Sequence, residues 1–161
     1  FKDYTESVYS VVMSSDGKVA ISASADGTLK VWDVDSGREL RTFNGHMESI
    51  RSVAMSKDGR LAIFASWDKM LKVWDVDSGR ELRTLIGHTE SVNGVAMSSD
   101  GKVAVSASSD KTLKVWNMEN GLCLTTFHAD CQIYACAVNS EGRNVLGGSG
   151  FGQMHFLHLE E

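Results

Sequence analysis

The chain has 161 residues, of which 42% are hydrophobic and 23% are charged, values that are ordinary for a folded domain. Its formal net charge is −5 and its lysines and arginines are not clustered, which argues against nucleic acid as a partner because phosphate binding needs a basic surface. No apolar run approaches the roughly 20 residues that cross a membrane, so we expect no membrane partner and a cytoplasmic location.

An internal repeat organises the chain. The stretch Leu29 to Thr42 has the sequence LKVWDVDSGRELRT, recurs without change at residues 71–84, and returns in altered form from residue 113 as LKVWNMENGLCLTT. Trp32, Trp74 and Trp116 lie 42 residues apart, a period that is typical of repeat architectures. Each residue is therefore best interpreted together with its equivalents in the other periods.

Each period is predicted to hold four short strands. In the third copy, residues 91–98 and 102–108 alternate apolar with small or polar residues, and the Asp-Gly turn between them is a strong hairpin signal. Residues 112–118 and 122–127 form a second pair of predicted strands. A four-stranded antiparallel sheet that is apolar on both faces needs a neighbour on each side, so we expect the sheets to stack as blades of an all-β propeller.

These repeats resemble WD-repeat propeller blades over the whole chain. The resemblance rests on the Gly-His pairs at residues 45–46 and 87–88, on Asp68 and Asp110 at the second hairpin turn, and on the strand tryptophans. The Trp-Asp pair is intact at residues 32–33 and 74–75 and becomes Trp-Asn at residues 116–117. The near identity of successive blades is similar to that of bacterial-type propellers in multidomain proteins.

In that family a His, a Ser or Thr, the turn Asp and the strand Trp form a buried hydrogen-bonded tetrad, in which the polar groups satisfy one another inside an apolar blade. Matched residue by residue, the resemblance gives His46, Ser66, Asp68 and Trp74 in the second blade, His88, Ser108, Asp110 and Trp116 in the third, and Ser24, Asp26 and Trp32 in the first. Tyr4 stands where the first blade should have its His, so we expect a weaker or rebuilt network there. The fourth period has lost the tetrad residues.

The resemblance implies rings of seven or eight blades, so four blades form about half of a typical ring. We place the blades approximately at residues 7–43, 49–85, 91–127 and 131–159, and the last blade lacks its outer strand within this chain. Such an arc leaves two open blade faces. Three resolutions stay open: the chain is a piece of a longer propeller, two copies close head to tail into an eight-bladed ring, or four blades close alone in a strained ring.

The sequence offers no catalytic site. Ser, His and Asp recur at equivalent places in successive blades, and a set that is repeated once per structural unit indicates a structural network. The loops that contain Asp and Gly lack the ligand spacing of a calcium loop. Cys123, Cys131 and Cys136 include no C-x-x-C pair, so we interpret them as reduced packing thiols and not as zinc ligands. We expect no enzyme activity, no metal and no cofactor.

Function is expected where the matched blades differ. The variable positions just inside the first strand and just before the turn Asp lie, according to the resemblance, on the ring face where WD-repeat proteins engage partners. We predict a partner-binding face made of Trp67, Arg51, Tyr9, Asn93 and Tyr134. Trp67 and Arg51 are its strongest candidates, because the equivalents of Trp67 are the small residues Ala25 and Ser109. The alternative interpretation is that Trp67 merely covers the top of its blade.

We interpret the chain as a non-catalytic protein-protein interaction scaffold or sensor module within a larger propeller or multidomain protein. One alternative is a self-assembling half-propeller with a mainly structural role, in which a homo-oligomer of two copies forms an eight-bladed ring. The other alternative is small-ligand binding or catalysis in the central channel.

Overall fold

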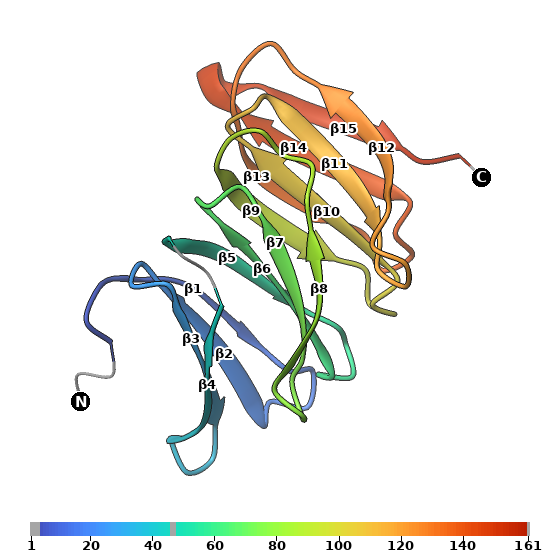
Figure 1. Ribbon diagram of the computed structural model, residues 1–161. Coiled ribbons are helices and arrows are strands. Elements are labelled where there is room, and N and C mark those ends of the chain that lie inside the picture. Colours follow the sequence, from blue (N-terminus) through green and yellow to red (C-terminus); the bar gives the residue numbers. More distant parts are fainter. Residues whose placement is uncertain (1–3, 46–47, 161) are drawn as a thin grey trace.

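The computed structural model describes residues 4–45 and 48–160, which form four antiparallel sheets, each a meander with its strands in chain order (Figure 1). We call them sheets 1 to 4. Their strands are β1 (Val8–Met13), β2 (Val19–Ser24), β3 (Thr28–Asp33) and β4 (Arg38–Asn44); β5 (Ile50–Met55), β6 (Leu61–Ser66), β7 (Leu71–Asp75) and β8 (Arg80–Leu85); β9 (Val92–Met97), β10 (Val103–Ser108), β11 (Thr112–Asn117) and β12 (Cys123–His128); and β13 (Ile133–Val138), β14 (Asn144–Ser149) and β15 (Met154–His158). A short 3-10 helix, η1 (Gly150–Gly152), joins β14 to β15. Across both described ranges, no helix is long and apolar enough to cross a membrane.

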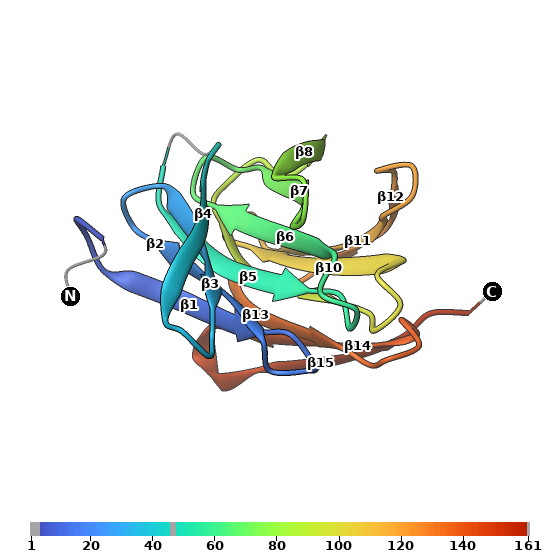
Figure 2. The same cartoon turned by 90° about the horizontal axis from the view of Figure 1, so that it is seen from below.

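The sheets stack face to face as blades of an open propeller arc. Contacts between neighbouring sheets run mainly through the first strands β1, β5, β9 and β13. Sheet 1 and sheet 4 lie at opposite ends of the stack in Figure 1, and the turned view of Figure 2 shows the sheets fanning outward from these first strands. Sheet 4 has three strands. The predicted all-β propeller segment with an incomplete last blade is therefore confirmed.

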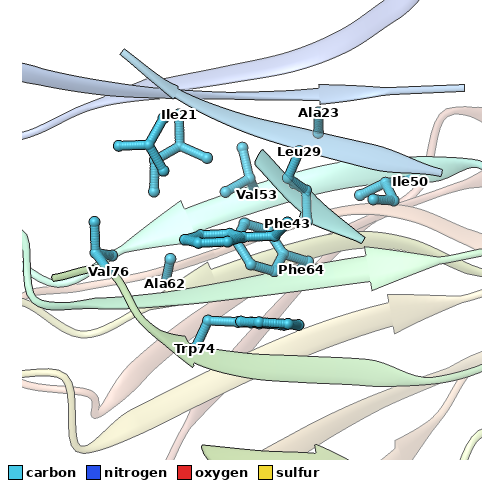
Figure 3. Close-up of a cluster of buried hydrophobic side chains, with 11 residues drawn as sticks. Ile21, Ala23, Leu29, Phe43, Ile50, Val53, Ala62, Phe64, Trp74 and Val76 are labelled. Carbon is cyan, nitrogen blue, oxygen red and sulfur yellow. The ribbon is translucent and has the colours of Figure 1, made fainter. Parts of the chain in front are cut away.

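Apolar contact between facing sheets holds the arc together. Ile21, Leu29 and Phe43 of sheet 1 meet Val53 and Phe64 of sheet 2 in one buried cluster (Figure 3). Equivalent clusters lie between sheets 2 and 3 and between sheets 3 and 4. Because each square ångström of apolar surface removed from water contributes about 25 cal/mol, an interior sheet is stabilised from both faces.

Polar bonds between the sheets fix how each sheet sits on the next. Near the axis, the backbone N–H of Val53 donates to Ser10 Oγ at 3.2 Å. At the rim, Arg41 Nη2 donates to the carbonyl oxygen of Asp77 in the next sheet's outer turn at 2.7 Å. The 42-residue repeat reproduces both kinds of bond between sheets 2 and 3.

Sheet 4 packs differently because its sequence departs from the repeat. Gly147 stands at the position that Ser106 occupies in sheet 3, and a Cβ added to it would lie 2.6 Å from Cδ1 of Leu113. Because Gly147 has no side chain, Leu113 of sheet 3 occupies this space. The equivalent positions of the other sheets hold Ser22, Phe64 and Ser106.

The two end sheets expose faces that interior sheets bury. Val11 on the outward face of sheet 1 is 64% exposed, whereas its equivalents Val53 and Val95 are each 7% exposed. Met154 and Phe156 of sheet 4 are exposed at the other end of the arc. The open ends therefore carry apolar side chains of the kind that facing sheets cover elsewhere.

The unequal burial of Val11, Val53 and Val95 predicts that replacing each by Ala lowers the free energy of unfolding by different amounts. Val53→Ala and Val95→Ala should each lower the free energy of unfolding by about 1–3 kcal/mol, because each removes buried methyl groups and leaves a cavity. Val11→Ala should cost only about 0.5 kcal/mol in dilute solution, where its methyl groups already contact water. Urea unfolding of the three variants measures this, and equal losses at all three positions would contradict an open face on sheet 1.

Candidate functional site

Sheet 3 contains a continuous buried network of polar side chains. His88 Nδ1 lies 2.7 Å from Asp110 Oδ2, and His88 Nε2 lies 2.7 Å from Ser106 Oγ. Trp116 Nε1 donates to Ser106 Oγ at 2.8 Å, and Thr112 Oγ1 donates to the other carboxylate oxygen of Asp110 at 2.6 Å. We assign the imidazole proton to Nδ1, because Ser106 can then donate to Nε2 and both ring nitrogens of His88, the Ser106 hydroxyl and the Trp116 N–H each have a partner.

The serine predicted for this network, Ser108, is not part of it. Its hydroxyl donates to two backbone carbonyl oxygens of the preceding loop at 3.2 and 2.9 Å and accepts the N–H of Asp110 at 3.1 Å. The equivalent predicted residues Ser66 and Ser24 likewise accept the N–H groups two residues later, at the turn Asp. Ser66 and Ser108 therefore fasten both the loop and the turn, and Ser24 fastens the turn. In sheet 3 the network residue is the serine two positions before Ser108, Ser106, on the same face of the strand.

In sheet 1 the network is rebuilt around a tyrosine. Trp32 Nε1 donates to Ser22 Oγ at 2.6 Å, and the Tyr4 hydroxyl bonds both the hydroxyl and, at 3.0 Å, the carbonyl oxygen of Ser22. Asp26 accepts the N–H and the hydroxyl of Thr5 at 3.2 and 3.0 Å. Tyr4 thus supplies the contact to the serine that His88 makes in sheet 3.

Sheet 2 has replaced part of the network with aromatic packing. Phe64 stands where sheets 1 and 3 have Ser22 and Ser106, and Trp74 Nε1 is buried without a hydrogen-bond partner in the part of the chain that the structure describes. The Trp74 ring instead stacks on Phe43, with centroids 4.9 Å apart and planes inclined by 12°. The predicted His46 lies outside the described residues.

Burial sets the charge state of the sheet 3 network. Desolvation lowers the pKa of His88 despite the nearby carboxylate, so the imidazole is neutral at neutral pH. Burial alone would raise the pKa of Asp110, but hydrogen bonds from Thr112 and His88 outweigh it and hold that pKa below the ordinary value. The network therefore combines a carboxylate with neutral donors.

A second set of residues is presented at the end of the blades where the loops precede each first strand. In sheet 1, Val8 and Ser10 pair with consecutive residues of β2, which leaves Tyr9 as the extra residue of a β-bulge. The same irregularity falls at Arg51, Asn93 and Tyr134 in the other sheets. A bulge bends the strand and re-aims a side chain, so these four positions point away from the regular pleat. We call the surface formed by this end of all four sheets the loop face.

On the loop face an arginine is held between two aromatic rings. The guanidinium carbon of Arg51 lies 4.0 Å from the ring centroid of Tyr9 and 4.8 Å from that of Trp67. Tyr9 is 47% exposed and Trp67 is 42% exposed, so the rings also face water. Such cation-π contacts hold the guanidinium against the rings without making hydrogen bonds from its N–H groups. We call these three residues the arginine stack.

The arginine stack borders a cavity of about 400 Å³ that reaches the remaining predicted residues. Its lining consists of Arg51, Trp67, Ser91, Asn93, Ser109 and Tyr134. Asn93 Nδ2 donates to Ser109 Oγ at 2.9 Å and to the carbonyl oxygen of Ile133 at 3.1 Å. Four of the five predicted residues thus share one cavity, and Tyr9 joins them through Arg51. Ser91 was not predicted, because Ser7 and Ser49 are its equivalents and comparison of variable positions could not reveal it.

The other candidate chemistry lies elsewhere. A cavity of about 370 Å³ on the surface opposite the loop face is lined largely by turn residues that recur between sheets, such as Asp16 and Asp58. Burial raises the pKa of the Cys136 thiol to about 12, and its sulfur donates to the carbonyl oxygen of Val105, which is the behaviour of a packing thiol. Within residues 4–45 and 48–160, no group of three His, Cys, Asp or Glu side chains could hold a metal ion.

Ser106→Ala should lower the free energy of unfolding by about 1–3 kcal/mol, because it strands both His88 Nε2 and Trp116 Nε1 inside sheet 3. Ser99→Ala, at an exposed turn serine, is the matched control and should change stability by less than about 0.5 kcal/mol. Urea unfolding curves give both values. A Ser106→Ala curve that superposes on that of the parent would remove Ser106 from the network.

His88 also predicts a pH dependence of stability. Its pKa in the folded chain lies below the ordinary value of 6.5, so the unfolded chain takes up the proton first as the pH falls. The contribution of His88 to the free energy of unfolding should therefore be fully present above pH 6.5, and the free energy of unfolding should decrease as the pH falls below that value. Titrating urea stability between neutral pH and about pH 5 measures the decline. His88→Gln should flatten this part of the profile, whereas an unchanged slope would contradict the neutral imidazole.

Known proteins share the repeat and the fold. The family model described as "WD domain, G-beta repeat" matches residues 1–33, 37–75 and 79–117. A component of chromatin assembly factor 1 from Mus musculus is 38% identical over 45 residues, which are 28% of this chain and 8% of that protein. The crystal structure of RRP9 WD40 repeats aligns with a TM-score of 0.87 at 23% identity, covering 96% of this chain and 52% of that chain. The structure of U3-55K aligns with a TM-score of 0.84 at 23% identity, covering 98% and 54%.

The extent of these matches separates what is shared from what is not. The chain spans about half the length of the two solved chains and a small part of the curated relative. The structural matches show the propeller fold, and the family model covers most of sheets 1 to 3. By its repeats and its fold, the chain belongs to the WD-repeat family.

Proposed function

We propose that this chain is a non-catalytic protein-interaction module that presents its loop face to a protein partner, as a scaffold or sensor. The observation that carries the proposal is the arginine stack beside the cavity of about 400 Å³. Tyr, Trp and Arg are the side chains that most often dominate the binding energy of protein interfaces. WD-repeat domains typically act as such scaffolds.

The exposure of the aromatic rings favours binding over a role as a cover. Trp67 would bury most of its ring if it only closed the top of sheet 2, yet it remains 42% exposed, and Tyr134 across the cavity is 54% exposed. Ala25 and Ser109 at the positions equivalent to Trp67 indicate that a blade does not need a large side chain there. The exposed rings are available to a partner.

The buried network favours a structural role over catalysis. Ser106, His88 and Asp110 are spaced like a nucleophile, a base and an orienting carboxylate. Ser106 is fully buried, however, and its oxygen already accepts the Trp116 N–H. A substrate would have to open the blade to reach it, so we assign the network to stability and propose no enzyme activity, no metal and no cofactor.

The open ends of the arc support a place within a larger propeller or multidomain protein. Sheets 1 and 4 expose Val11, Met154 and Phe156, and the solved chains that match are about twice as long. We propose that further blades of the same kind cover both ends. Closure by a second copy into an eight-bladed homo-oligomeric ring is the alternative, and a solution mass of two chains by light scattering would favour it.

Two further aspects of the proposal rest on the sequence. The net charge of −5 favours a protein partner over nucleic acid, and three free cysteines are compatible with a reducing, cytoplasmic location. The similarity of the blades to bacterial-type repeats remains a prediction from sequence, and one curated relative that matches is a mouse protein.

Affinity capture with the full chain as bait tests the interaction role. Trp67→Ala should weaken partner retention by about 30-fold or more, the loss expected for an interface residue worth at least 2 kcal/mol. Leu82→Ala, at an exposed residue of β8, is the matched control and should leave capture unchanged. Melting curves check that both variants fold. Equal capture by the parent and by Trp67→Ala would remove the loop face from the proposed function.

A further inference from the structure

The guanidinium of Arg51 is held in place but has no polar partner. Its carbon lies between the rings of Tyr9 and Trp67, and throughout the described part of the chain it makes no hydrogen bond and no ion pair. A guanidinium carries five N–H donors around its edge, in a fork that matches the two oxygens of a carboxylate. The two cation-π contacts use none of these N–H groups as hydrogen-bond donors to the protein, so the donors remain available to a ligand.

We propose that Arg51 is the receptor for a single carboxylate side chain on an extended peptide segment of the partner. This inference rests on the proposed interaction role of the loop face and specifies the chemistry that this face recognises. The stack holds the guanidinium in position before the ligand arrives, so little side-chain entropy is lost on binding. A bidentate pair of charge-assisted hydrogen bonds then supplies both affinity and orientation.

The cavity next to Arg51 suits the residues that flank the carboxylate. The rings of Trp67 and Tyr134 stand at its margin and can cover an apolar side chain, while Ser91 and Ser109 contribute hydroxyl groups. The Asn93 amide nitrogen is already bonded to Ser109 and to a backbone carbonyl, so its carbonyl oxygen is the atom of that side chain that can accept a peptide N–H. The site therefore combines one anion receptor with an apolar recess and one backbone acceptor.

The charges around the stack favour one carboxylate over a polyanion. Exposed glutamates lie in the loops that lead into β1, β5 and β9, on the loop face with Arg51; they are Glu6, Glu48 and Glu90. Lys69 and Lys111 are exposed in the second hairpin turns of sheets 2 and 3, so the face carries both signs of charge. A nucleic acid or an anionic membrane would meet the glutamates as well as Arg51. A peptide with one well-placed acid avoids that repulsion.

Selection from a display library of random short peptides on the full chain tests the proposal. Enriched peptides should carry Asp or Glu next to an apolar residue. Their affinities are then measured by fluorescence polarisation, each peptide also with Asn or Gln in place of the acid and with phosphoserine in its place. Removing the carboxylate should weaken binding about tenfold or more, as expected for loss of a charge-assisted hydrogen-bonded pair.

Variants of the chain assign that loss to Arg51. Arg51→Gln should weaken the acidic peptide about as much as the amide substitution does, and combining the two changes should add little, because both remove the same contact. Arg51→Lys should keep part of the affinity, since it retains the charge but not the fork. Arg80→Gln, at an exposed arginine of β8, is the control and should bind as the parent does.

The outcomes separate this inference from the proposed function. If Trp67→Ala abolishes binding while Arg51→Gln leaves it unchanged, the loop face binds a partner but the carboxylate receptor is overturned. Binding by the phosphoserine peptide alone, or failure to enrich any acidic peptide, also overturns it. If neither Trp67→Ala nor Arg51→Gln changes binding of an enriched peptide, the loop face itself is not the site. Melting temperatures that match the parent confirm that each variant is folded.

Discussion

The structure depends on one constraint: each sheet is apolar on both faces and is stable only when another sheet covers each of them. Ile21, Leu29 and Phe43 satisfy this for sheet 1 on one side by packing on sheet 2, and the same contact recurs at each following step of the arc. The bonds from Ser10 and Arg41 to the next sheet orient this contact but cannot replace it. Four blades do not close a ring, so sheets 1 and 4 each keep one apolar face exposed. Further blades or another chain would have to cover these two faces.

The polar networks show how far a blade can change while the packing constraint is met. Sheet 3 links His88, Ser106, Asp110 and Trp116, whereas sheet 1 reaches its serine with Tyr4. Sheet 2 gives up the serine for Phe64 and stacks Trp74 on Phe43, and among the described residues its buried indole N–H has no hydrogen-bond partner. Three blades with closely similar third strands thus stabilise their interiors in three ways. The network is one local means of filling a blade, while the facing apolar surfaces are common to all.

Spacing predicted the strands and their arrangement in repeated sheets: a period of 42 residues, Asp-Gly turns and alternating apolar residues. The loop face was predicted from the resemblance to WD-repeat blades and from the positions that vary between them, and its role in binding stays a prediction. The sequence did not predict which serine joins the network. Ser106 and Ser108 are two residues apart on the same face of β10 and both are fully buried, so neither periodicity nor burial distinguishes them. Only the direction of the hydrogen bonds does. Phe64 was the available clue to the network position, because it is the sheet 2 equivalent of Ser106 and its blade lacks a hydroxyl there. Matching the repeats instead favoured Ser108, whose equivalents in sheets 1 and 2 are also serines. The stack of Arg51 between Tyr9 and Trp67 joins two sheets, so it required the three-dimensional arrangement.

The β-bulge at the start of every first strand separates two tasks that a regular strand would combine. A residue in register must fit both the hydrogen-bond ladder and the packed face, so its identity is constrained by the blade. Tyr9, Arg51, Asn93 and Tyr134 stand outside that register, and four chemically unrelated side chains occupy the same position in successive blades. Each blade therefore contributes one residue whose identity can change without disturbing the sheet beneath it. Duplication of such a blade adds a further variable position to the rim of the ring, so new specificity can evolve by single substitutions on a scaffold that stays the same.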